Sequence, residues 1–127
     1  MTKKIWEMSA LQAHELLKNK EVSASEILEI SIKRIEEVDG HLNALPERCF
    51  ARAREVANNI DKNSSPKCKP NLLGLPMAIK DYNDLSGVRT TYGSIIFKNN
   101  IPKDSDRTIK LLERNGANPI AKSNVPE

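Results

Sequence analysis

The chain has 127 residues and a formal net charge of +3, from 20 basic and 17 acidic side chains. Hydrophobic residues make up 39% of it and aromatic residues only 4%, so a single, mostly aliphatic core is expected. The longest stretch without a charged residue is Pro70–Ile79, which is far shorter than the roughly 20 residues of a membrane-spanning helix. Basic and acidic residues are interleaved rather than clustered, which argues against a dedicated nucleic-acid-binding protein.

Two capping boxes predict the first two helices. Ser9 and Ser23 are each followed three residues later by Gln or Glu, so side chain and backbone can satisfy each other's first-turn groups. The helices are expected over residues 9–19 and 23–39. Gly40 stands where a left-handed residue would end the second helix.

The rest of the chain predicts two further helices and two short strands. Apolar residues at helical spacing predict a helix over residues 46–60, and Asp106 and Gly116 favour the start and end of a helix over residues 106–115. Short buried strands are expected at Met77–Lys80 and Ile120–Lys122. Because a long crossover with a helix joins them, they should pair in parallel, which indicates an α/β fold.

The two cysteines indicate the redox environment. Cys49 and Cys68 have no C-x-x-C pattern and no histidine at ligand spacing, so neither a zinc site nor a disulfide framework is expected. Reduced thiols are typical of a cytoplasmic protein. No signal peptide is evident, because Glu7 interrupts any apolar segment after the N-terminal lysines.

Lys80 is the candidate catalytic residue. It ends an apolar strand, and because side chains alternate along a strand, Asp81 should point away from it. Burial penalises the charged form of an amine, so a poorly hydrated lysine can act as a general base toward a serine hydroxyl. The alternative is an ordinary strand-end lysine whose ammonium reaches solvent.

Five blocks of the sequence together resemble the amidase signature family of amide hydrolases. They are SASEILE at Ser23–Glu29, LNALPERCFARARE at Leu42–Glu55, GLPMAIKD at Gly74–Asp81, GVRTTYGS at Gly87–Ser94 and ERNGANPIAKSNVPE at Glu113–Glu127. The resemblance covers nearly the whole chain, and the order and spacing of the blocks are specific.

The resemblance implies an α/β fold, with an N-terminal helical region and the first strands of an α/β/α sandwich, here truncated. Residues 1–127 would form the N-terminal part of an amidase signature domain. Within it, residues 1–60 would be a helical lead-in, residues 61–71 a loop and residues 72–127 the start of the sheet core. Pro119 departs from the family, which usually has a β-branched residue there. Because proline removes a ladder donor, we expect an irregular strand.

The resemblance also implies a chemistry. Family members hydrolyse carboxylic amides with a Ser–cis-Ser–Lys triad and need no metal or other cofactor, and the family's lysine maps onto Lys80. Their two serines lie in a Gly/Ser-rich segment downstream of the block that ends at Glu127, so we expect the chain alone to be inactive. Ser94 could substitute as a nucleophile, but it matches a different block and is better interpreted as a turn residue.

Two alternatives to a simple amidase acting on a small amide remain open. The chain also resembles the amidase component of a tRNA-dependent amidotransferase, which works with partner chains. A non-catalytic remnant that acts only by interaction is the other alternative. In either case the apolar strand that ends at Lys80 is expected inside a larger sheet, so self-association or pairing with a downstream segment is expected.

Overall fold

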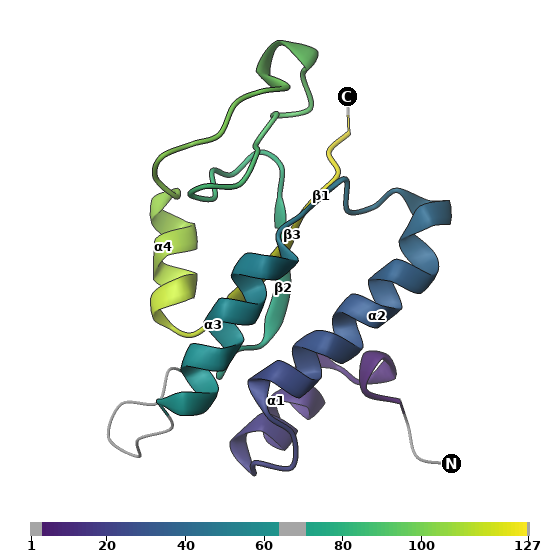
Figure 1. The fold of residues 1–127 in the computed structure, drawn as a ribbon, viewed down its shortest axis with the longest axis vertical. Helices are drawn as coiled ribbons and strands as arrows, with labels where there is room; N and C mark the ends of the chain where they lie inside the picture. The colour runs from purple at the N-terminus through teal and green to yellow at the C-terminus, as the bar shows by residue number, and fades with distance from the viewer. Residues whose placement is uncertain (1–3, 64–70, 127) are drawn as a thin grey trace.

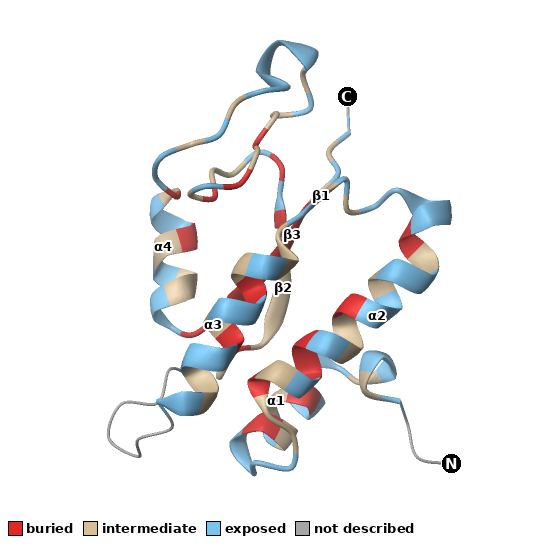
Figure 2. Ribbon diagram, viewed as in Figure 1, coloured by how far each residue is buried: buried red, intermediate tan, exposed pale blue. Residues whose placement is uncertain are grey.

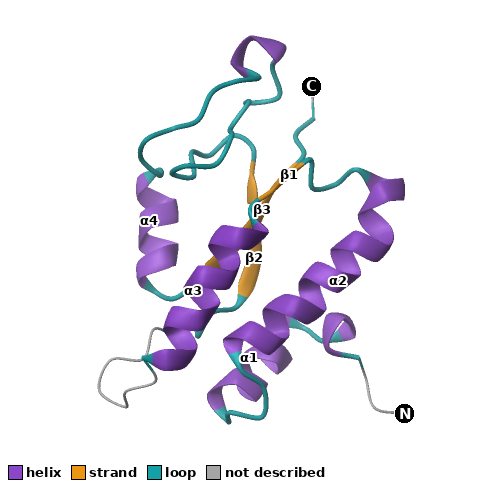
Figure 3. Ribbon diagram, in the orientation of Figure 1, coloured by secondary structure: helices purple, strands orange, loops and turns teal. Residues whose placement is uncertain are grey.

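The computed structural model describes residues 4–63 and 71–126. In this part of the chain, helices surround a small sheet (Figures 1 and 3). The helices are α1 (Ala10–Lys18), α2 (Ala24–Leu42), α3 (Phe50–Lys62) and α4 (Arg107–Arg114), with 3-10 turns at Ile5–Glu7 and Ile95–Phe97. The strands are β1 (Glu47–Arg48), β2 (Pro76–Lys80) and β3 (Asn118–Ser123).

The described strands form one sheet in the order β1-β3-β2. The predicted parallel pair is confirmed, because β2 and β3 run in parallel. Strand β1 pairs antiparallel with β3, so β3 is central. Strand β2 is an edge strand among the described residues, and the larger sheet expected around it stays a prediction.

The irregularity expected at Pro119 is present. Met77 pairs with Pro119, but the next residue, Ala78, pairs with Ala121, so the register shifts by one residue. Ile120, left over by the shift, uses its carbonyl to accept a hydrogen bond from the Cys49 amide at 3.0 Å. A proline without an N–H thus coincides with a break in the parallel ladder.

Both predicted capping boxes are confirmed. The Ser9 hydroxyl accepts from the Gln12 amide at 3.3 Å, and the Ser23 hydroxyl accepts from the Glu26 amide at 3.1 Å. In each box the Gln or Glu side chain accepts in return from the serine amide. Local side-chain chemistry therefore sets the starts of α1 and α2.

The predicted end of α2 was wrong. The helix continues through Gly40 to Leu42, and Asn43 takes the left-handed conformation with φ of 51°. Asn tolerates this conformation better than most residues. The Asp39 carboxylate accepts from the amides of Ala44 and Leu45, just beyond the helix, and so satisfies the donors that follow it.

The third helix starts later than predicted. It begins at Phe50, because Glu47–Arg48 form the short strand β1 instead of a first helical turn. The segment expected to be a helical lead-in therefore contributes a strand to the sheet. The loop predicted at 61–71 also begins later, since α3 extends to Lys62, and residues 64–70, including Cys68, lie outside the described residues.

Two main apolar clusters hold the sheet between helices. One joins the buried faces of α2 and α3 to β3, and its buried members are Ala24, Leu28, Ile32, Ala53, Ala57, Ile120 and Ala121. The other joins β2 to α4 and the loop between them through Ile79, Leu85, Val88 and Ile109. Figure 2 also shows buried residues on α1, and these pack against α2 in a third, smaller cluster. None of the described helices has the length and apolar character needed to cross a bilayer.

Candidate active site

Lys80 ends β2 with its side chain exposed. Its ammonium lies over the ring of Tyr82, 5.1 Å from the ring centroid. The Tyr82 hydroxyl in turn donates to the carbonyl of Pro126 at 3.1 Å. The poorly hydrated surroundings that would make Lys80 a base are therefore not formed by the described residues, because the face of β2 that carries Ala78 and Lys80 is open to solvent. In this part of the chain Lys80 is a strand-end lysine that reaches solvent.

Asp81 points away from Lys80, as predicted, and is buried. Its carboxylate accepts from the amide of Thr91 at 3.1 Å and from the hydroxyl of the same residue. Its own amide donates to the Ser123 carbonyl at 3.0 Å, and its carbonyl accepts from the Tyr92 amide at 3.1 Å. Every polar group of the residue that follows Lys80 is thus engaged.

Lys122 is the residue that sequence reasoning missed. It lies in the central strand with no exposed surface, and its ammonium is 3.3 Å from the Asp81 carboxylate. The ammonium also donates to the Thr90 hydroxyl at 2.8 Å and to the Asn83 carbonyl. Burial lowers the pKa of Lys122, and the Asp81 carboxylate opposes that change. The available signal was its place at the end of the predicted strand Ile120–Lys122.

A second polar cluster lies beside Lys122 in the loop that follows β2. The Tyr92 hydroxyl donates to the Asp84 carboxylate, and this contact raises the pKa of Tyr92. Asp106 is the N-cap residue immediately before α4, as predicted, but its carboxylate accepts from the Asn83 side chain and the Asp84 amide instead of from its own helix. These contacts fold the loop back onto the end of β2.

Ser94 and Ser123 have different surroundings. Ser94 begins the 3-10 turn Ile95–Phe97 and accepts from the Ile96 amide at 3.3 Å, so it is a turn residue, as predicted. Ser123 pairs with Lys80 in the parallel ladder. The two side chains therefore project from the same face of the sheet.

Other reactive side chains in the described residues have ordinary surroundings. Cys49 is an unpaired thiol, half-buried, and burial raises its pKa. Its sulfur donates to the Pro119 carbonyl at 3.5 Å. No group of three or more His, Cys, Asp or Glu side chains among residues 4–63 and 71–126 is arranged to hold a metal ion.

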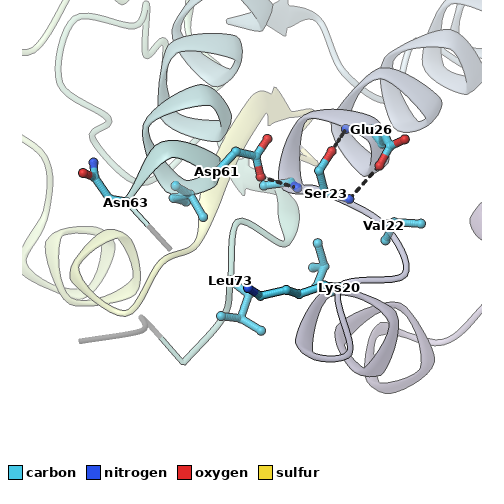
Figure 4. A pocket seen from close by; sticks show the side chains of 10 residues that line it. Lys20, Val22, Ser23, Glu26, Asp61, Asn63 and Leu73 are labelled. Carbon is cyan, nitrogen blue, oxygen red and sulfur yellow. Dashed lines mark hydrogen bonds between the residues drawn. The ribbon is translucent and has the colours of Figure 1, made fainter. Parts of the chain in front are cut away.

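A pocket of about 280 Å³ lies away from Lys80, between the start of α2 and the end of α3 (Figure 4). Leu17, Ile60 and Leu73 contribute apolar side chains to it. The Asp61 carboxylate at its wall accepts from the amides that begin α2, at 2.8 and 3.0 Å. Leu73 precedes β2, whereas Lys80 ends it, so this pocket belongs to the opposite end of the strand.

Comparisons with known proteins identify the family of this chain. Residues 26–127 match the model of the Amidase family. A glutamyl-tRNA(Gln) amidotransferase subunit from Dehalococcoides mccartyi is 30% identical over 120 residues, which are 94% of this chain and 25% of that protein. A bacterial aryl acylamidase of the amidase signature family superposes with a TM-score of 0.83 and 26% identity, covering 94% of this chain and 25% of the other.

The chain belongs to the amidase signature family. It spans about a quarter of the length of the relatives that it matches. Fatty acid amide hydrolase has the same fold over 99% of this chain, with a TM-score of 0.86 and 20% identity. The α/β class predicted from the sequence is thereby confirmed.

Proposed function

We propose that this chain supplies the lysine base of an amide hydrolase. The observation that carries the proposal is the position of Lys80, which projects from the end of a parallel strand onto an accessible face. The resemblance of the surrounding sequence to the family supports assigning the family's lysine to Lys80. In this scheme residues 1–127 form one part of an amidase domain. The two catalytic serines of that domain would come from sequence other than these 127 residues.

The proposed chemistry is proton transfer, with no bond formed to the lysine. A neutral Lys80 amine takes a proton from an intermediary serine, which takes one from the nucleophilic serine as its oxygen attacks the amide carbon. The proton then goes to the leaving nitrogen, and water releases the acyl group. Because the exposed Lys80 is hydrated in this chain, we expect the amine to become an effective base only where further polypeptide covers it.

The isolated chain should therefore show no amide hydrolysis, since a lysine base without a nucleophile forms no acyl intermediate. The decisive test is a chimera in which residues 26–127 replace the matching segment of the aryl acylamidase. Aryl acylamide hydrolysis by this chimera should fall by about 10²–10⁴-fold in the Lys80→Ala variant.

The Lys33→Ala variant is the matched control, because Lys33 is an exposed lysine on α2. It should leave turnover unchanged. A chimera that is active and loses nothing on Lys80→Ala would contradict the proposal. A chimera that binds its substrate and folds, yet is inactive with Lys80 present, would favour a non-catalytic remnant.

A second candidate function is the amidase part of a tRNA-dependent amidotransferase. It is favoured by the similarity to the glutamyl-tRNA(Gln) amidotransferase protein over 94% of the chain. The two functions differ in the fate of the released nitrogen, which leaves as free ammonia or amine in one and is transferred to glutamyl-tRNA(Gln) in the other. A second chimera, built on the Dehalococcoides mccartyi protein with its partner chains, would support this candidate if it formed amidated tRNA and depended on Lys80.

A further inference from the structure

We propose that Lys122 is a positioning residue for Lys80, acting through Asp81. The inference rests on the proposed role of Lys80 as base, but the contacts that carry it lie within this chain. Lys122 itself has no exposed surface, so it cannot touch a substrate.

The ammonium of Lys122 is fully coordinated. Its acceptors are the Asp81 carboxylate at 3.3 Å, the Thr90 hydroxyl at 2.8 Å and the Asn83 carbonyl. An ammonium has three N–H donors, so this arrangement leaves none over. A buried ammonium is stable only while its hydrogen-bond and ion-pair partners are in place. Lys122 therefore restricts the positions of Asp81, Thr90 and Asn83.

Asp81 transmits this constraint to Lys80. Its carboxylate is held by Lys122 and Thr91, its amide by Ser123 and its carbonyl by Tyr92. The peptide bond that joins Lys80 to Asp81 is thus fixed on its C-terminal side by these contacts and on its N-terminal side by the β2–β3 ladder. The direction of the Lys80 side chain follows from that backbone.

The two lysines do not face each other. Ile79 pairs with Lys122 in the parallel ladder, so the side chains of Ile79 and Lys122 share one face of the sheet. Lys80 follows Ile79 and projects from the opposite face. Lys122 therefore acts on Lys80 through the backbone of Asp81, and the Lys122 ammonium lies on the other face of the sheet from the Lys80 ammonium. Because of this geometry, Lys122 can position Lys80 but cannot exchange a proton with it directly.

If Lys122 only stabilises the fold, its replacement should leave the position of Lys80 unchanged in the folded chain. The Tyr82 ring reports that position. The Lys80 ammonium lies 5.1 Å from the ring centroid, so the ring current should shift the Lys80 Hε resonance in the folded chain. The Lys80→Arg variant identifies that resonance by its loss, and Tyr82→Leu gives its position without the ring. If the parent chain and Tyr82→Leu give the same Lys80 resonance, Lys80 has no fixed position and the proposal fails.

The test compares Lys122→Met with Leu28→Ala in the 127-residue chain. Leu28 is fully buried between α2 and α3, so its truncation weakens the fold without touching Asp81. We expect Lys122→Met to move the Lys80 resonance by about half or more of the way to its value in Tyr82→Leu. Leu28→Ala should leave it in place at temperatures where the variant is folded. A folded Lys122→Met variant with an unmoved resonance would overturn the proposal.

A milder variant decides the question if Lys122→Met does not fold. Thr90→Val keeps the shape of a buried side chain but removes one of the three acceptors of Lys122. A partial movement of the Lys80 resonance supports the proposal, and no movement overturns it.

Activity supplies an independent arm. In the aryl acylamidase chimera, Lys122→Met should lower kcat by about 10²-fold with little change in KM, the effect of a misplaced group. If Lys80→Ala leaves the chimera active, the role of Lys80 as base fails, whereas the resonance experiment still reports whether Lys122 positions it. The two failures are therefore distinguishable.

Discussion

Lys80 and Lys122 lie one register position apart on two hydrogen-bonded parallel strands, yet Lys80 is exposed and Lys122 has no exposed surface. Strand alternation accounts for this difference, because the two side chains project from opposite faces. One face is covered by the loop that follows β2, and the other is open at the edge of the sheet.

The first prediction is that the two lysines differ sharply in their contribution to stability. Lys122→Met leaves the buried Asp81 carboxylate without its positively charged partner and should lower the free energy of unfolding by about 3–5 kcal/mol. Lys80→Met removes only an exposed side chain and should change it by less than about 0.5 kcal/mol. Urea unfolding of both variants checks this, and equal losses would contradict the burial described here.

The second prediction concerns Gly40 inside α2. Glycine in a helix interior is less favourable than alanine by about 0.5–1 kcal/mol, and a Cβ added at Gly40 meets no atom within 4 Å. Gly40→Ala should therefore raise the free energy of unfolding by that amount. A loss of stability would indicate that the helix ends at Gly40, as the sequence alone suggested.

The third prediction separates backbone conformation from packing at two other glycines. Gly74 and Gly87 both have positive φ, 86° and 75°, but an added Cβ at Gly74 lies 2.7 Å from the Cβ of Ala24, whereas at Gly87 it meets nothing. Gly87→Ala should lower the free energy of unfolding by about 1–2 kcal/mol through backbone strain alone. Gly74→Ala should lower it by about 1–3 kcal/mol more, because the added Cβ overpacks against Ala24. Thermal unfolding of the pair measures the difference, and similar melting temperatures would count against the close contact with α2.

The fourth prediction is a pH dependence at Asp39. Burial opposes its ionisation, but hydrogen bonds from the amides of Ala44 and Leu45 and from the Arg48 guanidinium outweigh burial and lower the pKa of the Asp39 carboxyl. The folded chain then binds fewer protons than the unfolded chain at low pH. The resulting stability is fully present above the unfolded pKa of about 4 and is lost as pH falls through the lower folded pKa.

Asp39→Asn isolates this contribution. The parent chain should be more stable than the variant at neutral pH, and the difference should shrink as the pH falls below about 4. Urea midpoints measured across the acid range provide the comparison. A difference that stays constant with pH would show that the carboxylate charge contributes nothing.

The fifth prediction is self-association of the isolated chain. The side chains of Ile95, Ile96 and Ile101 are 82%, 83% and 61% exposed, and β2 is an edge strand among the described residues. Exposed apolar segments and open strand edges favour association. Sedimentation should show an average mass that rises with concentration, and the double variant Ile95→Ser/Ile96→Ser should reduce the rise. A monomer at all concentrations would refute this prediction.

Some features could be predicted from the sequence because they depend on neighbours within a few residues. The capping boxes at Ser9 and Ser23 each join residues three positions apart, and the apolar spacing that follows defines one face of a helix. The parallel pairing of β2 and β3 followed from the helix between them. The alternation at Lys80 and Asp81 is likewise a property of any strand.

Other features were decided only by tertiary structure. The Lys122 ammonium contacts Thr90 and Asn83, which are 32 and 39 residues away, so its local sequence could not show which groups would bind it. Strand β1 forms because Glu47–Arg48 meet the edge of β3, whereas the helical spacing around them favoured a helix. Local patterns fix the conformations that a segment prefers, but the burial of a charge depends on which distant groups fold against it, and that is a property of the assembled chain.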